Sequence, residues 1–550
     1  MLDPNILIWP DNHTYQAFER TPKFAQADQG LHSLYLKMHT RTGLTYDPAE
    51  AEALFEQETS DAAQQNIPLN KGSEDIPLTI VTVSRNDEHV ERMPERSQAF
   101  IDGVIFLAEK FQTKTELILV EWNPPAENPL MAEQFSYPKN HPYISVIIIT
   151  VPKKLHDQYI TGANMPLYQM IGKNIGIRRA RGRFVVATNI DVLLSEALFS
   201  TIIKPDLDTG NLYRSNRWDV DRKILDEANA GDMISAAKNM TFQVQYRAGT
   251  QQRDTTNPHH EPEKIILAGN RTEQHLLPQL HTMACGDFQM MARDDWFTMR
   301  GYAELDGYSF HLDSLFALMC HYQGFNEHVF SDECPHFHID HTLGQEAKSD
   351  TYIMQNNKAL KHISYGGLIF LNTYMADAGT PHVNRSNWGL SQCDLPISHV
   401  CRADWEQEAV AYTIQADTAA TCLVDLQKLE SFSYGVISDW VARTIKQLTQ
   451  FIKQRLKGRE FYIWGPGGRG QILAAELSKQ GIEVAGFIQG GDAPLQQIEG
   501  CPYTVSGPQE LLKPEDRKPF IGIATIYAGE VCAELEAKGW VEGEDYIVMV

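Results

Sequence analysis

The sequence predicts an α/β protein with a doubly wound mixed sheet, a helical connector and a small second sheet domain. Between residues 76 and 190, short apolar runs alternate with helical patterns, which is typical of parallel β-α-β units. The same alternation starts again after residue 459, behind a glycine-rich turn. The 550 residues allow roughly three to four domains, and 43% apolar residues are enough to bury several cores.

Four strands and two helices are expected in the first unit. Because each is a short apolar or β-branched run, strands are predicted at 78–83, 116–120, 144–151 and 184–187. Apolar residues at helical spacing predict one helix around 100–111, and a second is expected over 166–181. In a sheet of this kind, ligands bind beyond the carboxyl ends of the strands.

We expect four segments along the chain. They are a polar helical extension at 1–75, a sheet domain at 76–345, a connector at 346–458 and a second sheet domain at 459–550. The connector is predicted to be loop-rich at first and helical in its later part, where apolar residues keep a helical stripe up to Leu456.

Composition excludes several classes of function. The charge sum of 48 − 71 = −23 disfavours a broad nucleic-acid groove, which needs clustered Lys and Arg. No apolar run approaches the ~20 residues of a membrane helix, and the first residues lack the pattern of a signal peptide. Eight cysteines without a C-x-x-C pair favour a reducing cytoplasm. Peripheral contact with a membrane and the oligomeric state stay open.

The first motif with chemical meaning runs from Asn174 to Asp191. It reads N-x-G-x-x-x-A-x-G, followed by a strand whose end carries Asn189 and Asp191. Alternation along a strand places these two side chains on one face. A carboxylate there suits Mg²⁺ or Mn²⁺, which proteins bind through few ligands plus phosphate oxygens. The alternative is that Asp191 caps the next turn.

This motif resembles the family 2-like glycosyltransferases of GT-A fold, with matches at Asn174, Gly176, Ala180, Gly182 and Asp191. The chain departs at Asn189, where the family usually has Asp. The resemblance implies a nucleotide-sugar donor and a divalent metal, Mn²⁺ or Mg²⁺, held by Asp191, with Asn189 contacting metal or ribose.

The resemblance also implies donor contacts at the ends of the first two strands and on the helix before Asp191. In this reading Arg85 meets a phosphate and Glu121 accepts from the base or ribose. The expected donor residues, besides Asn189 and Asp191, are Ser84, Arg85, Asn86, Glu121, Lys173, Asn174 and Arg178. The alternatives are ordinary turn residues at the strand ends and a solvated basic helix face.

The second motif resembles the acceptor side of the same family. A Gly-Tyr-x-Glu turn at 301–304 leads to Asp313, which opens a helix that ends at Gly324; Leu312 replaces the usual Glu. The resemblance makes Asp313 the general base of an inverting transfer to a hydroxyl of a glycan or lipid-linked acceptor, with Asp306 second. Asp313 also suits a helix N-cap.

Other residues are predicted around these motifs. Asp287 and Trp388 are expected to bind the acceptor, Trp388 by stacking on a sugar if it is exposed and not a buried plug. Three histidines stand at 336, 338 and 341, and neutral imidazole is a common metal ligand. The resemblance favours one late histidine in the metal shell, and His338 and His341 are the candidates.

The second sheet domain opens with Gly465, Gly467 and Gly470, which fit G-x-G-x-x-G after a strand and predict a nucleotide near a helix N-terminus. The acidic residue expected after the next strand is missing, which argues against NAD. The unit resembles Rossmann-like domains appended to sugar-modifying enzymes.

Three other functions remain open. They are a non-catalytic nucleotide-sugar-binding protein, a nucleotidyltransferase and an NAD(P)-dependent enzyme acting through the C-terminal domain. The second needs a glycine-rich loop after the first strand, and residues 84–89 contain no glycine.

Overall fold

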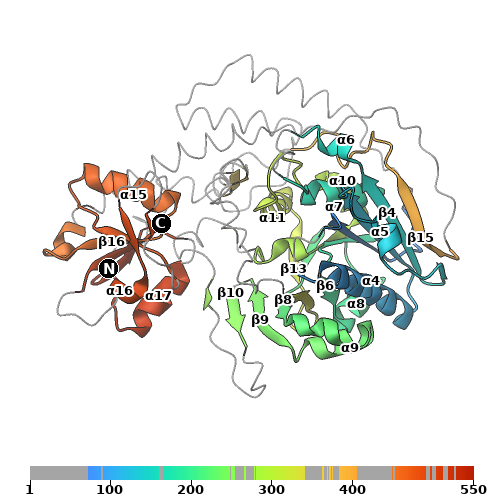
Figure 1. The fold of residues 1–550 in the computed structure, drawn as a ribbon, viewed down its shortest axis with the longest axis horizontal. Coiled ribbons are helices and arrows are strands. Elements are labelled where there is room, and N and C mark those ends of the chain that lie inside the picture. Colours follow the sequence, from blue (N-terminus) through green and yellow to red (C-terminus); the bar gives the residue numbers. More distant parts are fainter. Residues whose placement is uncertain are drawn as a thin grey trace, which may run out of the picture.

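Three sheets organise the part of the chain that the computed structural model describes (Figure 1). The described residues are 72–340, 383–405 and 452–549 without 88–90, 160–164, 248, 254–265, 268–277, 279, 491–495, 498–502, 512–517 and 526–527, together with residue 449 and a few residues between 362 and 375. Most of the predicted N-terminal extension, most of the predicted connector and His341 lie outside them.

The first sheet has nine strands. In spatial order these are β13 (Asn326–Val329), β7 (Asn211–Arg214), β12 (Phe288–Ala292), β5 (Phe184–Thr188), β1 (Leu78–Ser84), β2 (Thr115–Trp122), β4 (Ile144–Val151), β15 (Ile397–Ala403) and β3 (Asn140–His141). Strands β5, β1, β2 and β4 are parallel, whereas β12 and β15 run antiparallel to their neighbours β5 and β4. The four predicted strands are confirmed, with β4 at its predicted bounds. The sheet is therefore mixed.

Helices cover both faces of this sheet, which is confirmed as doubly wound α/β (Figure 1). One core holds α7 (Gln169–Arg179), α10 (Arg293–Met299) and α11 (Leu312–Gln323); the other holds α4 (Met93–Lys110), α8 (Glu196–Ile202) and α9 (Ala230–Ala237). Short turns of helix complete the unit: α5 (Met131–Gln134), α6 (Lys153–His156), η2 (Arg222–Asp226) and η4 (Cys285–Asp287).

Close contact between α7 and β1 explains two glycines of the first motif. A Cβ on Gly176 would lie 2.3 Å from Val81 Cγ1, and one on Gly182 would lie 2.6 Å from the Thr79 amide nitrogen. Both distances are far below van der Waals contact. The glycines therefore allow the helix and the following turn to lie directly on the sheet.

A second sheet of six strands stands beside the first. Its order is β11 (Ile266–Leu267), β10 (Gly249–Gln252), β9 (Thr241–Tyr246), β8 (Arg217–Val220), β14 (His336–Ile339) and β6 (Val192–Leu194). Strand β14 is parallel to β8 and antiparallel to β6. This pairing brings the segments around residues 191, 219 and 338 together.

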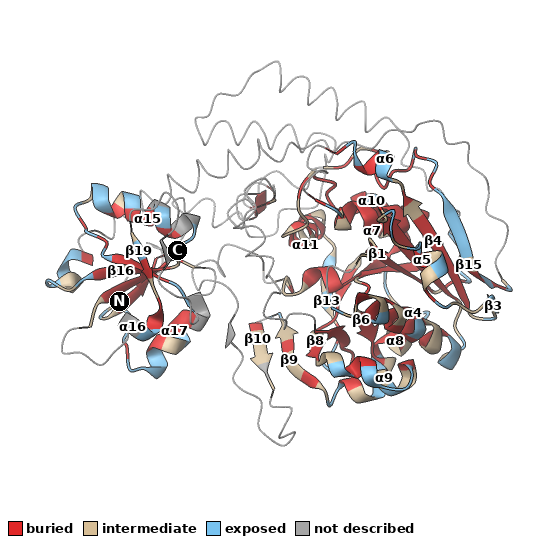
Figure 2. Ribbon diagram, viewed as in Figure 1, coloured by how far each residue is buried: buried red, intermediate tan, exposed pale blue. Residues whose placement is uncertain are grey.

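The C-terminal unit has its own six-stranded sheet and its own apolar cores (Figure 2). The order is β18 (Gln496–Gln497), β19 (Thr504–Ser506), β17 (Gly486–Ile488), β16 (Phe461–Trp464), β20 (Phe520–Ile523) and β21 (Tyr546–Val548). Its helices are α15 (Gly468–Lys479), α16 (Pro508–Leu511) and α17 (Ala528–Ala537). The five parallel strands run in the order 3-2-1-4-5, so the winding reverses between β16 and β20.

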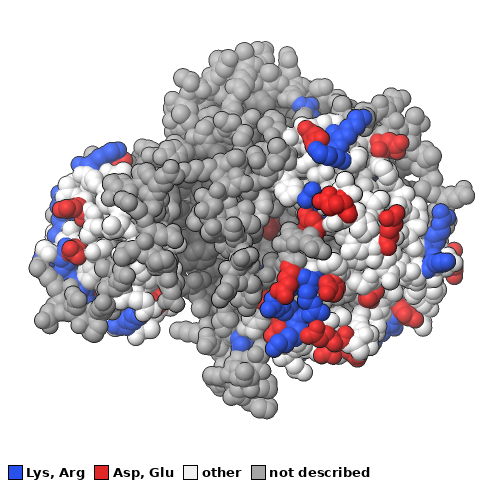
Figure 3. Space-filling model, in the orientation of Figure 1, with Lys and Arg blue, Asp and Glu red and all other residues white. Residues whose placement is uncertain are grey.

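Two surface properties bear on the excluded classes. No helix among the described residues is long and apolar enough to cross a membrane. Acidic and basic side chains are intermixed on the face shown in Figure 3.

Candidate functional site

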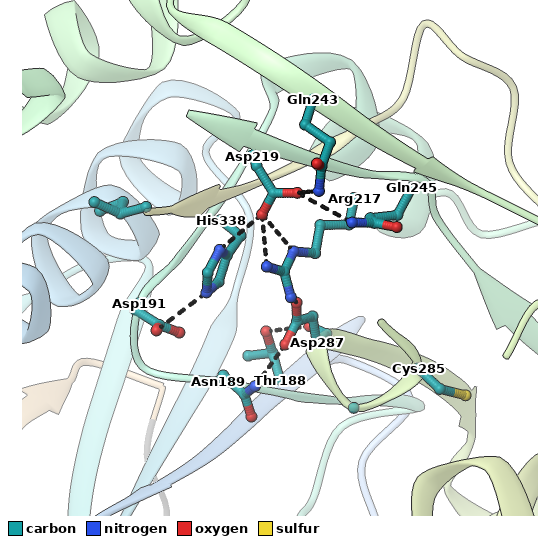
Figure 4. Close-up of polar contacts among 12 residues, drawn as sticks. Thr188, Asn189, Asp191, Arg217, Asp219, Gln243, Gln245, Cys285, Asp287 and His338 are labelled. Carbon is teal, nitrogen blue, oxygen red and sulfur yellow. Dashed lines mark hydrogen bonds and ion pairs between the residues drawn. The ribbon is translucent and has the colours of Figure 1, made fainter. Parts of the chain in front are cut away.

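Side chains from the first and second sheets meet at the carboxyl end of β5 (Figure 4). Lys173 of α7 is fully buried there, and its Nζ donates to Asn189 Oδ1 at 2.8 Å and to a carbonyl of η4 at 2.7 Å. Burial lowers the pKa of Lys173 to about 8, although the negative charges of Asp287, Asp313 and Asp191 act to raise it. Lys173 thus joins the end of β5 to η4 through two hydrogen bonds.

Asp191 and Asp219 lie on either side of the His338 imidazole (Figure 4). His338 Nε2 is 3.4 Å from Asp191 Oδ2, and Nδ1 is 3.0 Å from Asp219 Oδ1. Strand register produces this arrangement, because His338 stands opposite Asp219 on one side and Val192 on the other. Burial and Arg217 would lower the pKa of His338, but the two carboxylates outweigh them and raise it to about 9.

Arg217 links this pair to the end of β5. Its Nε donates to Asp219 Oδ1 at 2.7 Å, and its Nη1 donates to Asp287 Oδ2 at 2.8 Å. The other oxygen of Asp287 accepts from the Asn189 amide at 2.5 Å. Burial raises the pKa of Asp287, but Arg217 outweighs it, and the pKa lies below its usual range. Asp287, predicted to bind acceptor, therefore has both oxygens engaged inside the cluster.

Asn189 is a connector within this network. Its Oδ1 accepts hydrogen bonds from Gln169 and Lys173, each at 2.8 Å, and its Nδ2 donates to Asp287. An amide oxygen has two lone pairs, and both are used here. This arrangement makes Asn189 a link between α7 and η4, and its predicted contact with metal or ribose stays a prediction.

Asp313 lies in the first turn of α11, beside η4. The helix begins at Leu312 with His311 as its N-cap residue, so Asp313 is not the N-cap. Its Oδ1 accepts from the Ser314 amide at 2.8 Å, and burial raises its pKa while Lys173 opposes the shift. A carboxylate with a raised pKa is a better proton acceptor. The second candidate, Asp306, accepts from the Tyr168 hydroxyl at 2.7 Å.

The sequence analysis missed Arg217, Asp219 and the two glutamines of β9. Gln243 and Gln245 donate to Asp219 Oδ2 at 3.1 and 3.5 Å. A signal was present, because Arg-x-Asp and Gln-x-Gln place two polar side chains on one face of a strand. Their partners are remote in sequence, and only the pairing of β8, β9 and β14 joins them.

Three of the predicted donor residues at the ends of β1 and β2 mainly hold their own loops. The Asn86 side chain donates to the Pro129 carbonyl and to Gln134, and Ser84 Oγ accepts from the Asn86 amide. Glu121 is fully buried, and its oxygens accept from the Met131 amide and the Thr150 hydroxyl. Burial raises its pKa. These contacts oppose a role for Glu121 in binding a base or ribose.

Arg85 is the partly exposed member of this group. Its Nε donates to the Asn123 carbonyl at 3.1 Å, and its Nη1 forms an ion pair with Asp87 at 2.9 Å. Both partners lie on strand-end loops, so Arg85 joins the ends of β1 and β2. Its predicted phosphate contact stays a prediction.

Asn174 and Arg178 of α7 form a buried clamp on two other segments of the chain. Asn174 holds Tyr302, and Arg178 holds residues 384–390, which include Trp388. Arg178 lies over the Trp388 ring at 4.7 Å and donates to the Ser386 carbonyl, whereas Asn174 binds the main chain of Tyr302. Trp388 is fully buried, so it is a plug and not an exposed sugar platform. Arg178 and Asn174 are buried as well, and their predicted donor contacts stay predictions.

Glu304 completes this clamp and gives it a pH dependence. Its Oε1 accepts from the Gly389 amide at 2.7 Å and from Asn174 at 3.0 Å. Burial raises the pKa of Glu304 from 4.5 to about 7. Since the folded chain holds this proton more tightly than the unfolded chain, its contribution to stability is complete below pH 4.5 and is lost as the pH rises through 7.

We therefore predict that Glu304→Gln stabilises the chain selectively at high pH. The uncharged amide keeps an acceptor oxygen and cannot ionise. Between pH 5 and pH 8, the difference in unfolding free energy between variant and wild type should move by about 3 kcal/mol in favour of the variant. Urea unfolding of the full chain measures it, with the exposed Glu133→Gln as control. An unchanged difference would contradict the predicted ionisation of Glu304.

The residues present fit a divalent cation in part. Among the described residues, no group of three or more His, Cys, Asp and Glu side chains is arranged to hold a metal ion. Asp191 and His338 nevertheless offer one oxygen and one nitrogen donor 3.4 Å apart, and Mg²⁺ or Mn²⁺ bound to a diphosphate takes few protein ligands. His336 is buried with both ring nitrogens unpartnered among the described residues, and burial lowers its pKa to about 3.

The three glycines of the C-terminal unit have distinct geometries. Gly465 has φ +117, which L side chains rarely adopt, and it follows β16 at the point where the winding reverses. A Cβ on Gly470 would lie 1.9 Å from the Gly465 carbonyl oxygen, whereas one on Gly467 would meet nothing within 4 Å. Tight turn, open approach and close helix packing are the three demands of a nucleotide-binding glycine motif.

This difference predicts a large loss of stability for one alanine substitution and almost none for the other. Gly470→Ala should destabilise the C-terminal sheet by roughly 1–3 kcal/mol, because the added methyl overlaps a main-chain oxygen. Gly467→Ala should change stability by less than about 0.5 kcal/mol. Hydrogen exchange of β16 and α15 in the full chain measures both, and equal exchange in the two variants would be the wrong outcome.

Comparison with known proteins adds no relative. No protein-family model matches the chain, and a search of the curated proteins finds no match.

Proposed function

We propose that the chain is a metal-assisted, inverting glycosyltransferase that moves a sugar from a nucleotide-sugar donor to a hydroxyl of a glycan or lipid-linked acceptor. In this proposal the first unit has a GT-A-like fold and the C-terminal unit is a Rossmann-like domain. The observation that carries it is the position of Lys173 between the two motifs. Its amine binds Asn189, two residues before Asp191, and the carbonyl of Gly286, whose Cβ position lies 3.1 Å from Asp313 Oδ2.

The donor diphosphate would lie between these two motifs. A divalent ion on the diphosphate would neutralise the charge that develops on the leaving group. Asp191 and His338, whose side chains lie 3.4 Å apart, would hold it. Lys173 adds a positive charge from its buried position, and Asn189 and the Gly286 carbonyl fix that position through their hydrogen bonds.

Asp313 would act on the acceptor. As the acceptor oxygen attacks the anomeric carbon, the bond from that carbon to the diphosphate oxygen breaks, and the hydroxyl proton passes to the Asp313 carboxylate. One displacement inverts the anomeric centre. The Ser314 amide fixes one carboxylate oxygen of Asp313, which leaves the other to meet the hydroxyl.

A coupled assay for nucleoside diphosphate release tests the proposal. UDP-, GDP-, CDP- and dTDP-sugars are offered to the full chain with and without Mn²⁺, together with hydroxyl acceptors. The proposal expects release from one donor, dependent on Mn²⁺ and increased by acceptor. If none of the donors is turned over, with or without Mn²⁺, the proposal is wrong.

One observation favours a second candidate, a nucleotide-sugar-binding protein without transfer. Asn189 replaces the second carboxylate of the resembled motif, and its amide is used internally. One carboxylate holds a divalent ion less firmly than two. Donor binding by calorimetry without any release in the coupled assay would favour this candidate.

A further inference from the structure

We propose that Asp219 is a positioning residue that aims the His338 imidazole at Asp191, so that these two side chains face a donor-bound divalent ion together. The inference rests on the proposed function, because it assigns a residue to the metal-facing side of the same cluster. Asp219 belongs to neither motif of the resemblance, and it enters the cluster from the second sheet.

The contacts at His338 support this role. Nδ1 lies 3.0 Å from Asp219 Oδ1, while the opposite ring nitrogen is 3.4 Å from Asp191. A carboxylate that binds one imidazole nitrogen fixes both the ring orientation and the tautomer, and a metal ion can then take the place of the proton on the other nitrogen. Without that partner, the ring can rotate about its bond to Cβ, and Nε2 no longer has a fixed direction.

Asp219 is itself held rigidly. Arg217 donates to Oδ1, and Gln243 and Gln245 donate to Oδ2, so both oxygens have partners besides His338. The side chain is 4% exposed. The intervening Trp218 points to the apolar core on the other side of the strand, so the polar face of β8 is directed to the cluster. A carboxylate fixed in this way is suited to orient a neighbour.

Mn²⁺ binding to the full chain in the presence of UDP, GDP, CDP or dTDP, followed by electron paramagnetic resonance, tests the inference. Asp219→Ala should weaken Mn²⁺ binding by roughly 10–100-fold, the usual effect of losing such a partner. Asp219→Asn should weaken it by roughly 3–10-fold, because its amide oxygen still accepts from the imidazole but carries no charge. His336→Leu is the matched control on the same strand, and it should leave binding within about twofold, because its nitrogens have no described partner.

The outcomes separate the inference from the proposed function. Binding within twofold of wild type in both Asp219 variants overturns the inference, and Asp219→Asn alone decides it if Asp219→Ala does not fold. A wild-type chain that binds no Mn²⁺ with any of these nucleoside diphosphates also overturns it, even where sugar transfer is observed. If the variants bind Mn²⁺ more weakly and the wild type turns over no donor, the inference is supported and only the transferase proposal is contradicted.

Discussion

Asp313→Asn is expected to lower kcat for sugar transfer by roughly 10²–10⁴-fold, while the donor KM changes by less than about threefold. The amide cannot take the acceptor proton, but its oxygen can still accept from the Ser314 amide, so the turn of α11 is kept. Because burial raises the pKa of Asp313, the acidic limb of the wild-type kcat profile should lie above the usual range of an aspartate. Steady-state transfer kinetics across pH measure both effects.

The matched comparison is Asp306→Asn, which changes the other candidate base. Asp306 accepts from the Tyr168 hydroxyl, and an amide oxygen preserves that contact. The assignment expects Asp306→Asn to lower kcat by less than about tenfold. A larger loss at Asp306 than at Asp313 would transfer the role of base to Asp306.

Asp191→Asn is expected to have the second large effect, on metal and donor together. It should weaken Mn²⁺ binding by roughly 100-fold or more and lower kcat/KM at least as much. The effect is larger than that of Asp219→Ala, because the substitution removes a metal ligand itself and not a residue that orients a ligand. Calorimetric titration with Mn²⁺ and transfer kinetics measure the two quantities.

Asp295→Asn is the control for Asp191→Asn. Asp295 is a partly buried carboxylate outside the cluster, where it accepts from the Gly210 amide. It should leave Mn²⁺ binding unchanged. An Asp191→Asn variant that binds Mn²⁺ as tightly as wild type, and whose activity does not recover in excess Mn²⁺, would show that Asp191 is not a metal ligand.

The parallel core of the first sheet could be predicted because its strands are buried on both faces. Strands β1 and β2 are buried along their whole length, and apolar and β-branched residues make up most of each strand. The second sheet could not be predicted in the same way. Its strands β8 and β14 are four residues long, carry Arg, Asp and His, and pair with segments more than a hundred residues away.

Site residues could be predicted where they belong to a sequence motif. The prediction failed where residues of the same types serve packing instead. Asp191, His338 and Lys173 lie in one cluster, whereas Arg178 and Glu121 serve the scaffold. A basic side chain beside a glycine-rich turn can bind a phosphate or a main-chain carbonyl, and the sequence is the same in both cases. The carbonyl that Arg178 binds belongs to Ser386, which no local pattern connects to α7.

A crystal structure of the full chain with Mn²⁺ and the nucleoside diphosphate that it binds best would test the central claim most directly. The account predicts the diphosphate between Asp191 and Asp313, with Mn²⁺ against Asp191 and His338. A diphosphate bound only at Gly465–Gly470, or a metal bound away from Asp191, would contradict it.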